Sequence, residues 1–274
     1  MNVFQQMLFL SSLLLTLCLS QKTMAQPGDS LYTLHQQLPE NIRFFTTDQL
    51  QQCYLVTKEN ELIKYNDQGN LLFRFNNNRL GALAFVDATD PFNLLLYYPE
   101  FLTVIFLDRT LNPTGEYNLY DLDIIEVKAL GLANDNNIWI YDDVSFRVKK
   151  INRNGTVLSE SDDLSLLLGQ GIQPNFIVER QNLVFVNDPE VGILQFDLFG
   201  QYVKTLEITG LREFQILDSR LIYRQEGTLY SFHLESLATQ KIAFPQGQKK
   251  LEKIEIQKDR MYIQDGNQLF LYAY

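Results

Sequence analysis

Apolar and polar residues alternate along most of this chain in short runs that end at Asn, Asp or Gly. The stretch ILQFDLFGQYV, residues 193–203, is a clear example. Apolar residues alternate up to Phe196, a polar corner follows at Asp197–Gly200, and a second apolar run begins at once. Period-two alternation on both sides of such a corner predicts a β-hairpin.

The hairpin pattern recurs along the chain. Similar stretches occupy 61–75, 103–117, 147–161 and 228–242, and a shortened copy, QLFLYAY, ends the chain at 268–274. In most copies an apolar or aromatic residue is followed by Asp or Asn, as in Tyr65-Asn66, and successive copies lie 36 to 45 residues apart. This spacing predicts six repeats of one structural unit.

Each repeat also contains two short apolar runs before its hairpin. The runs next to the hairpins are 53–57, 93–98, 137–141, 182–186, 220–224 and 260–264, and the earlier ones are 42–47, 81–86, 127–133, 175–179, 213–217 and 253–257. Only residues 163–170, DLSLLLGQ, interrupt this pattern, with at most one or two helical turns. Four-stranded antiparallel units at this spacing are typical of a β-propeller. The predicted fold is therefore all-β, a six-bladed propeller of four-stranded antiparallel blades.

Closure of the ring makes a sharper prediction. The sixth repeat reaches Tyr274 without a fourth strand, which would leave an unpaired sheet edge. The segment SLYTLHQQL at 30–38 reads as a strand and belongs to no repeat. We therefore expect Leu31–Gln36 to pair with the last strand, so that an N-terminal strand closes the final blade.

Two repeats carry a family resemblance. Residues 136–158, NNIWIYDDVSFRVKKINRNGTVL, and 182–203, NLVFVNDPEVGILQFDLFGQYV, resemble NHL-type repeats. The chain as a whole is similar to the exported NHL-like six-bladed propellers found in Bacteroidota. The resemblance concerns the scaffold, and such scaffolds host unrelated functions.

The N-terminus predicts export. Residues 7–20, MLFLSSLLLTLCLS, form an uncharged apolar run, and Thr23–Ala25 supplies small residues for cleavage before Gln26. The run is shorter than the roughly 20 residues that span a bilayer. Cys18 follows Leu17 rather than a small residue, which disfavours a lipid anchor. We therefore expect a signal peptide at 1–25 and a propeller domain at 26–274, located in the periplasm, at the outer membrane or outside the cell, and not spanning a membrane after cleavage.

Composition narrows the choice of partners. The net charge is −10, so the surface repels phosphate backbones and nucleic acid is not an expected partner. Hydrophobic residues make up 46% of the chain, which is ample for a core. Cys53 alone remains after cleavage, so no intramolecular disulfide is expected.

The candidate binding rim lies on the loops between the second and third strand of each repeat. In propellers such loops lie at one mouth of the channel. They contribute acidic residues and some aromatic ones: Glu59, Glu61, Tyr97, Tyr98, Glu100, Phe101, Asp142, Asp143, Asp188, Glu190, Glu226 and Asp265. Two interpretations of the acids stay open: a negative mouth that attracts a cation or a basic segment, or ordinary turn residues in water. The aromatic residues likewise either form a recognition surface or pack between blades.

Candidate catalytic residues are few. A three-histidine zinc site, as in the NHL-type amidating lyase, is excluded because the mature chain has only His35 and His233. There is no G-x-S-x-G motif for a serine nucleophile, and Cys53 has no histidine partner in the pattern. Gluconolactonase-like propellers instead hold a divalent cation with Glu, Asp and Asn, residues that are plentiful here without a distinctive spacing.

These observations predict a rigid, non-catalytic module without a cofactor that binds another cell-envelope protein. The alternative is a metal-dependent hydrolase or lactonase whose divalent cation is held by oxygen ligands at the channel mouth. Carbohydrate binding is a third possibility, based only on the aromatic and acidic residues.

Overall fold

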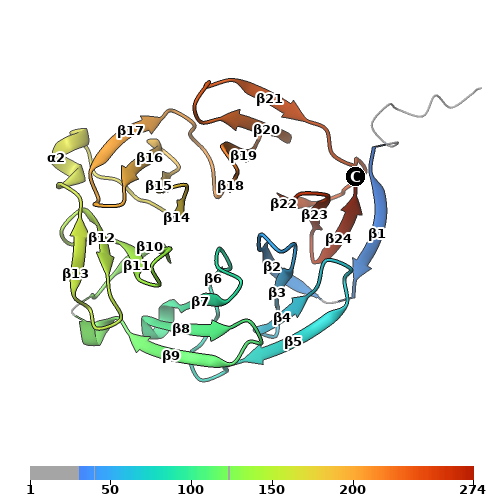
Figure 1. Cartoon of the computed structure of the whole chain (residues 1–274), viewed down its shortest axis with the longest axis horizontal. Helices are drawn as coiled ribbons and strands as arrows, with labels where there is room; N and C mark the ends of the chain where they lie inside the picture. Colours follow the sequence, from blue (N-terminus) through green and yellow to red (C-terminus); the bar gives the residue numbers. More distant parts are fainter. Residues whose placement is uncertain (1–30, 40, 123) are drawn as a thin grey trace, which may run out of the picture.

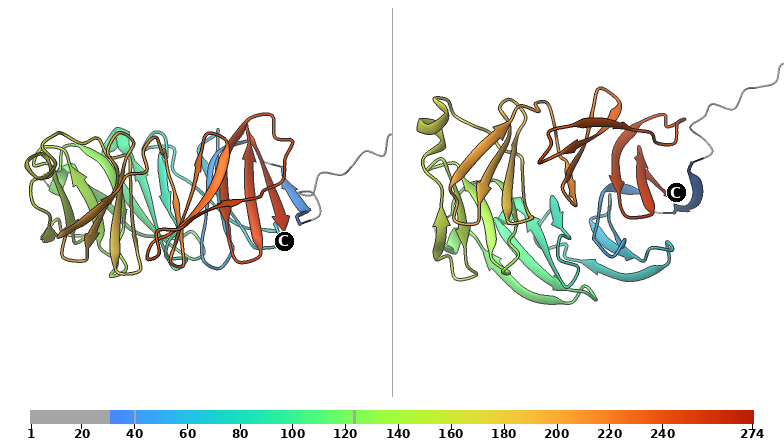
Figure 2. Two further views of the ribbon diagram at one scale, coloured as in Figure 1. Left: turned by 90° about the horizontal axis from the view of Figure 1, so that it is seen from above. Right: turned by 45° about the horizontal axis from the view of Figure 1, so that its top comes forward.

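The chain forms a ring of six sheets around a central opening (Figure 1). A computed structural model describes residues 31–39, 41–122 and 124–274. Seen from the side, the ring is a flat disc (Figure 2). Every sheet has four antiparallel strands, so the predicted six-bladed propeller is confirmed. The expected signal peptide at 1–25 lies outside the described residues.

The strands follow one another from the centre of each blade to its rim. Blade 1 contains β2 (Ile42–Thr47), β3 (Cys53–Thr57), β4 (Glu61–Tyr65) and β5 (Leu71–Asn76), and blade 2 contains β6 (Phe85–Asp87), β7 (Asn93–Tyr98), β8 (Thr103–Asp108) and β9 (Pro113–Asn118). Blade 3 contains β10 (Val127–Leu132), β11 (Ile138–Asp142), β12 (Arg147–Ile151) and β13 (Val157–Glu160), and blade 4 contains β14 (Phe176–Arg180), β15 (Leu183–Asp188), β16 (Gly192–Asp197) and β17 (Tyr202–Leu206). Blade 5 contains β18 (Gln215–Leu217), β19 (Arg220–Gln225), β20 (Thr228–His233) and β21 (Thr239–Ile242), and blade 6 contains β22 (Leu251–Ile256), β23 (Arg260–Asp265), β24 (Gln268–Ala273) and, at its rim, β1 (Thr33–Leu38). The helical segments are η1 (Pro99–Phe101), η2 (Tyr120–Leu122) and α2 (Leu164–Leu168).

The N-terminal strand closes the ring. Strand β1 pairs antiparallel with β24, with Thr33 opposite Ala273 and Leu38 opposite Leu269. The Leu38 side chain is 1% exposed and packs into the core between blades 6 and 1. The predicted closure is therefore confirmed, with the strand at Thr33–Leu38 instead of Leu31–Gln36.

The recurring Asp or Asn has a local structural role in the turn between the third and fourth strands. The Asp197 carboxylate accepts hydrogen bonds from the backbone N–H groups of Phe199 and Gln201, both at 2.8 Å. Asn66, Asp108 and Asn152 make the equivalent pair of bonds two and four residues ahead. In blade 5 the Nδ1 atom of His233 accepts from Glu235 and Ser236 at 3.3 Å. The repeat signature thus encodes a side-chain-capped turn.

Apolar side chains form the core between neighbouring blades. Between blades 3 and 4, for example, Trp139 and Tyr141 pack against Ile177, Val184 and Leu194. The indole nitrogen of Trp139 also donates to the Glu179 carboxylate of blade 4 at 2.5 Å. Such contacts hold each blade against the next.

Hydrogen bonds from inner strands also cross the blade boundaries. The Gln215 side chain of blade 5 donates to the Ile256 carbonyl of blade 6 at 2.7 Å and accepts from the Ile256 N–H at 3.0 Å. The Glu255 carboxylate of blade 6 accepts from the Thr47 N–H of blade 1 at 2.8 Å. Buried polar groups paired in this way fix one arrangement of the blades.

Candidate functional site

The central channel is a cavity of about 900 Å³ lined mainly by the inner strands of blades 1, 2, 4, 5 and 6. The phenyl rings of Phe85 in blade 2 and Phe176 in blade 4 pack edge to face, with their centroids 6.2 Å apart, although blade 3 lies between those blades in the sequence. Gly131 in β10 packs so closely on blade 4 that an added Cβ would lie 2.5 Å from the Ile177 carbonyl oxygen. The inner strand of blade 3 is therefore shielded from the cavity.

A partly buried charge cluster lies on the channel wall between blades 5, 6 and 1. The Nζ atom of Lys253 lies 2.7 Å from Glu213 and 2.8 Å from Glu255, and it donates to the Phe45 carbonyl at 3.0 Å. Burial alone would lower the pKa of Lys253, but the two carboxylates hold that pKa above its usual range. The cluster joins three blades around one ammonium group.

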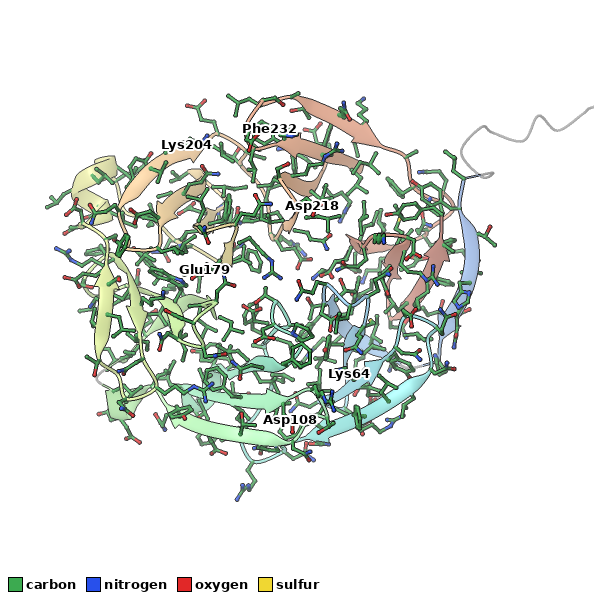
Figure 3. All side chains as sticks on the ribbon, in the orientation of Figure 1. Lys64, Asp108, Glu179, Lys204, Asp218 and Phe232 are labelled. Atoms are coloured by element: carbon green, nitrogen blue, oxygen red, sulfur yellow. The ribbon has the colours of Figure 1, made fainter. Side chains whose placement is uncertain are left out.

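Two other acids of the channel, Asp48 and Asp87, accept hydrogen bonds from backbone N–H groups. The Asp48 carboxylate accepts from Leu50 at 2.8 Å and Gln52 at 2.9 Å, and the Asp87 carboxylate accepts from the Leu132 N–H at 2.8 Å. In the part of the chain that the structure describes, no three His, Cys, Asp or Glu side chains are grouped to hold a metal ion. Figure 3 shows Asp218 near the central opening, with Lys204 and Phe232 toward the rim.

The predicted rim acids lie on turns of all six blades, and most of them have local partners. Asp142 pairs with Lys149 at 2.6 Å, and Glu61 pairs with Arg74 at 2.5 Å. Four others bind backbone N–H groups or a lysine: Glu100 (Ala82), Asp188 (Gln173, Glu190 and Val191), Asp265 (Lys249 and Lys250) and Asp143 (the Lys128 side chain). Glu59, Glu190 and Glu226 are exposed at the tips of their turns.

Several acids of blades 3 and 4 lie near one side chain, that of Tyr141. The hydroxyl of Tyr141 is buried. Burial first, and then the nearby carboxylates of Asp143, Asp163 and Asp188, raise the pKa of Tyr141. These carboxylates come from two blades and from the segment that joins them.

The aromatic members of the predicted rim have different environments. Tyr97 and Tyr98 are buried in the blade packing, at 7% and 0% exposure, and burial raises the pKa of Tyr97 to about 12. Phe101 on η1 is half exposed. Neither histidine lines the channel, since His35 is on β1 and His233 caps an outer turn.

An exposed apolar group lies where blades 3 and 4 meet, and sequence reasoning did not assign it to the site. Asp163 caps the short helix α2 by accepting from the N–H groups of Ser165 at 2.9 Å and Leu166 at 3.2 Å. Leu164 is fully buried and anchors this helical turn in the core. Leu166 and Leu167 are therefore presented outward, at 81% and 45% exposure.

Two neighbouring turns extend this apolar group. The N–H of Leu164 donates to the Phe146 carbonyl at 2.9 Å, which places the turn between β11 and β12 beside α2. The outer turn of blade 4 packs on the segment before α2, since a Cβ at Gly200 would lie 2.7 Å from the Glu160 carbonyl carbon. We call the resulting surface the α2 patch; it consists of Val144 (62% exposed), Phe146 (36%), Leu166, Leu167 and Phe199 (74%).

Solved structures similar to this chain are propellers of diverse roles. A catalytically inactive variant of virginiamycin B lyase from Staphylococcus aureus, solved with quinupristin, has a TM-score of 0.62 and 12% identity, covering 89% of this chain and 99% of the lyase. The Pan2 WD40 domain from Neurospora crassa has a TM-score of 0.64 and 9% identity, covering 88% and 95%. A Bacteroides caccae protein of unknown function has a TM-score of 0.51 and 13% identity, covering 75% and 78%.

These similarities concern the fold alone, because every identity is far below 25%. No protein-family model matches the sequence. No curated protein matches it either. The function must therefore be argued from the residues of this chain.

Proposed function

We propose that this protein is an exported, rigid module that binds another protein of the cell envelope and carries out no catalysis. The observation that carries the proposal is the α2 patch, a group of exposed apolar side chains on a scaffold whose blades are joined by buried hydrogen bonds. Clustered exposed apolar side chains are typical of protein interaction sites. The resemblance of 136–158 and 182–203 to NHL-type repeats agrees with this role.

Rigidity supports binding over chemistry. Cross-blade bonds such as Trp139–Glu179 and Gln215–Ile256 fix the sheets, so exposed turns keep their geometry before a partner arrives. A surface that is already ordered loses little conformational entropy on association. The channel carboxylates of Asp48, Asp87 and Glu255 already accept hydrogen bonds from the protein, which makes them less suited to hold the cation of the hydrolase alternative.

Site-specific photo-crosslinking tests the binding role. With p-benzoylphenylalanine in place of Leu166, irradiation of producing cells is expected to give a discrete adduct with another protein, because this side chain is 81% exposed within the α2 patch. Leu237, which is 56% exposed on the outer turn of blade 5, is the matched control and should give none. Failure to obtain an adduct at Leu166, or the same adducts at both positions, would contradict the proposal.

Export has its own test. N-terminal sequencing of the protein recovered from producing cells is expected to begin at Gln26, because Thr23–Ala25 provides small residues for cleavage. An Ala25→Arg variant should accumulate as the uncleaved precursor in the membrane fraction. Recovery of the wild-type chain from the cytoplasm with Met1 intact would refute export. In the described ranges no helix is long and apolar enough to span a bilayer.

A further inference from the structure

We infer that the α2 patch binds a cationic amphipathic segment of its partner, one that presents apolar side chains flanked by Lys or Arg. The inference rests on the proposed function and adds the chemistry of the partner. Its basis is the combination of exposed apolar side chains with neighbouring exposed carboxylates, those of Glu160, Asp162 and Glu190.

The apolar side chains of the α2 patch come from three neighbouring chain segments. Leu166 and Leu167 project from α2, Val144 and Phe146 lie on the adjoining turn of blade 3, and Phe199 lies on the outer turn of blade 4. All five exceed one third exposure. Three separate chain segments therefore place apolar groups around one helical turn, an arrangement that suits the apolar face of a bound helix.

The charge around the patch is negative over a long stretch of sequence. Residues 154–203 contain seven acidic residues and a single basic one, Arg180. The Arg180 side chain lines the central channel and donates to the Thr89 carbonyl at 3.2 Å, so its charge lies in the channel and not beside the α2 patch. Glu179 and Asp188 are buried, and Asp163 and Asp197 cap turns of the backbone. The exposed acids of this stretch are therefore Glu160, Asp162 and Glu190, and one exposed lysine, Lys204, follows directly after it.

Two basic residues of β12, next to the patch, are already engaged. Arg147 donates to the Ser161 carbonyl at 2.5 Å and lies 3.7 Å from Glu160, and Lys149 pairs with Asp142 at 2.6 Å. Asp162 is exposed, and among the described residues no ion pair engages its carboxylate. This residue lies immediately before the cap of α2, where a partner's ammonium or guanidinium group would meet it.

Charge complementarity selects this occupant over others. A second copy of the chain in a two-fold symmetric dimer would place the same acidic surface against itself, and a membrane rich in anionic lipid would be repelled. A cationic amphipathic segment complements both the apolar and the acidic side chains of this surface. Its apolar face would cover the leucines, and its charges would pair with Asp162 and the neighbouring carboxylates. Such charge pairing speeds association and is weakened by salt.

Defined peptides test the chemistry directly. An 18-residue helical peptide of leucine and lysine, labelled with fluorescein, is expected to bind the mature protein in an anisotropy titration. The same peptide with glutamate in place of lysine should not bind. Leu166→Ser with Leu167→Ser should weaken binding by roughly tenfold or more, and Asp162→Asn should weaken it several-fold and reduce its dependence on salt.

The matched control variant carries Leu237→Ser and Glu235→Gln on the outer turn of blade 5, and its affinity should equal that of the wild type. Equal binding of both peptides, or no loss in the leucine variant, would overturn the inference. Self-association of the wild-type protein that Leu166→Ser abolishes would also overturn it, in favour of a second copy. If crosslinking at Leu166 yields a partner but the lysine peptide does not bind, the proposed function stands and the cationic chemistry is wrong.

Discussion

A mature chain that begins at Asn41, and therefore lacks strand β1, is expected to lose most of its resistance to urea. Without β1, strand β24 becomes an exposed edge and the hydrogen bonds from Thr33–Leu38 are lost. The core between blades 6 and 1 also loses Leu38, which packs with Phe45 and Leu269. Loss of this side chain alone, as in Leu38→Ala, costs about 2–5 kcal/mol.

Urea unfolding followed by circular dichroism measures the effect. Leu34→Ala is the matched control, because Leu34 lies on the same strand but is 52% exposed, and its midpoint should change little. A truncated chain that unfolds with the wild-type midpoint and slope would show that ring closure adds nothing to stability. Unchanged stability in Leu38→Ala would contradict the packing argument separately.

The architecture was predictable because its determinants are local and repeated. The alternation of apolar residues defines each strand, and the recurring Asp or Asn marks a turn that its own side chain caps, as at Asp197. The closure was predictable because the last repeat lacked one strand and one strand-like segment, near Leu38, belonged to no repeat. Each of these signals depends on residues close together in sequence.

The surface was less predictable because it depends on contacts between blades. The loop position of Tyr97 and Tyr98 left their environment open, and neighbouring blades decide that both side chains are buried. The reverse holds for Leu166, whose run of leucines suggests a core segment. The capped turn at Asp163 buries Leu164 and directs Leu166 outward. No periodicity in the sequence distinguishes these two leucines.

The channel illustrates the same limit. A six-fold repeat suggests that all six inner strands line the cavity, yet blade 3 is shielded by its neighbours. The reason is the close approach of Gly131 to Ile177, which only a residue without a Cβ permits. Likewise the two carboxylates around Lys253 and the Phe45 carbonyl come from residues whose proximity depends on the closed ring.

Lys253→Met is expected to destabilise the protein by about 3–5 kcal/mol, because it leaves buried carboxylate charge without its cation. Glu255 is only 9% exposed, and its second oxygen is held by Thr47 at 2.5 Å, so it cannot turn toward solvent without breaking that bond. In the wild type the raised pKa of Lys253 means that its stabilisation is complete below the ordinary lysine value of about 10.4 and is lost only as the pH rises through the raised value. The free energy of unfolding attributable to Lys253 should therefore be constant from pH 6 to 9.

Removing the charge of Glu255 as well tests the same explanation. With the ammonium group gone, the carboxylates of Glu213 and Glu255 lose the cation that each of them contacts. Adding Glu255→Gln should restore part of the loss at neutral pH, because the amide still accepts from Thr47 without a charge. Lys204→Met, at an exposed lysine toward the rim in Figure 3, should change the urea midpoint little. If Lys253→Met and Lys204→Met lowered the free energy of unfolding equally little, the Lys253 cluster would contribute no more than a surface ion pair. Apolar packing would then be the main stabilisation of the junction of blades 5, 6 and 1.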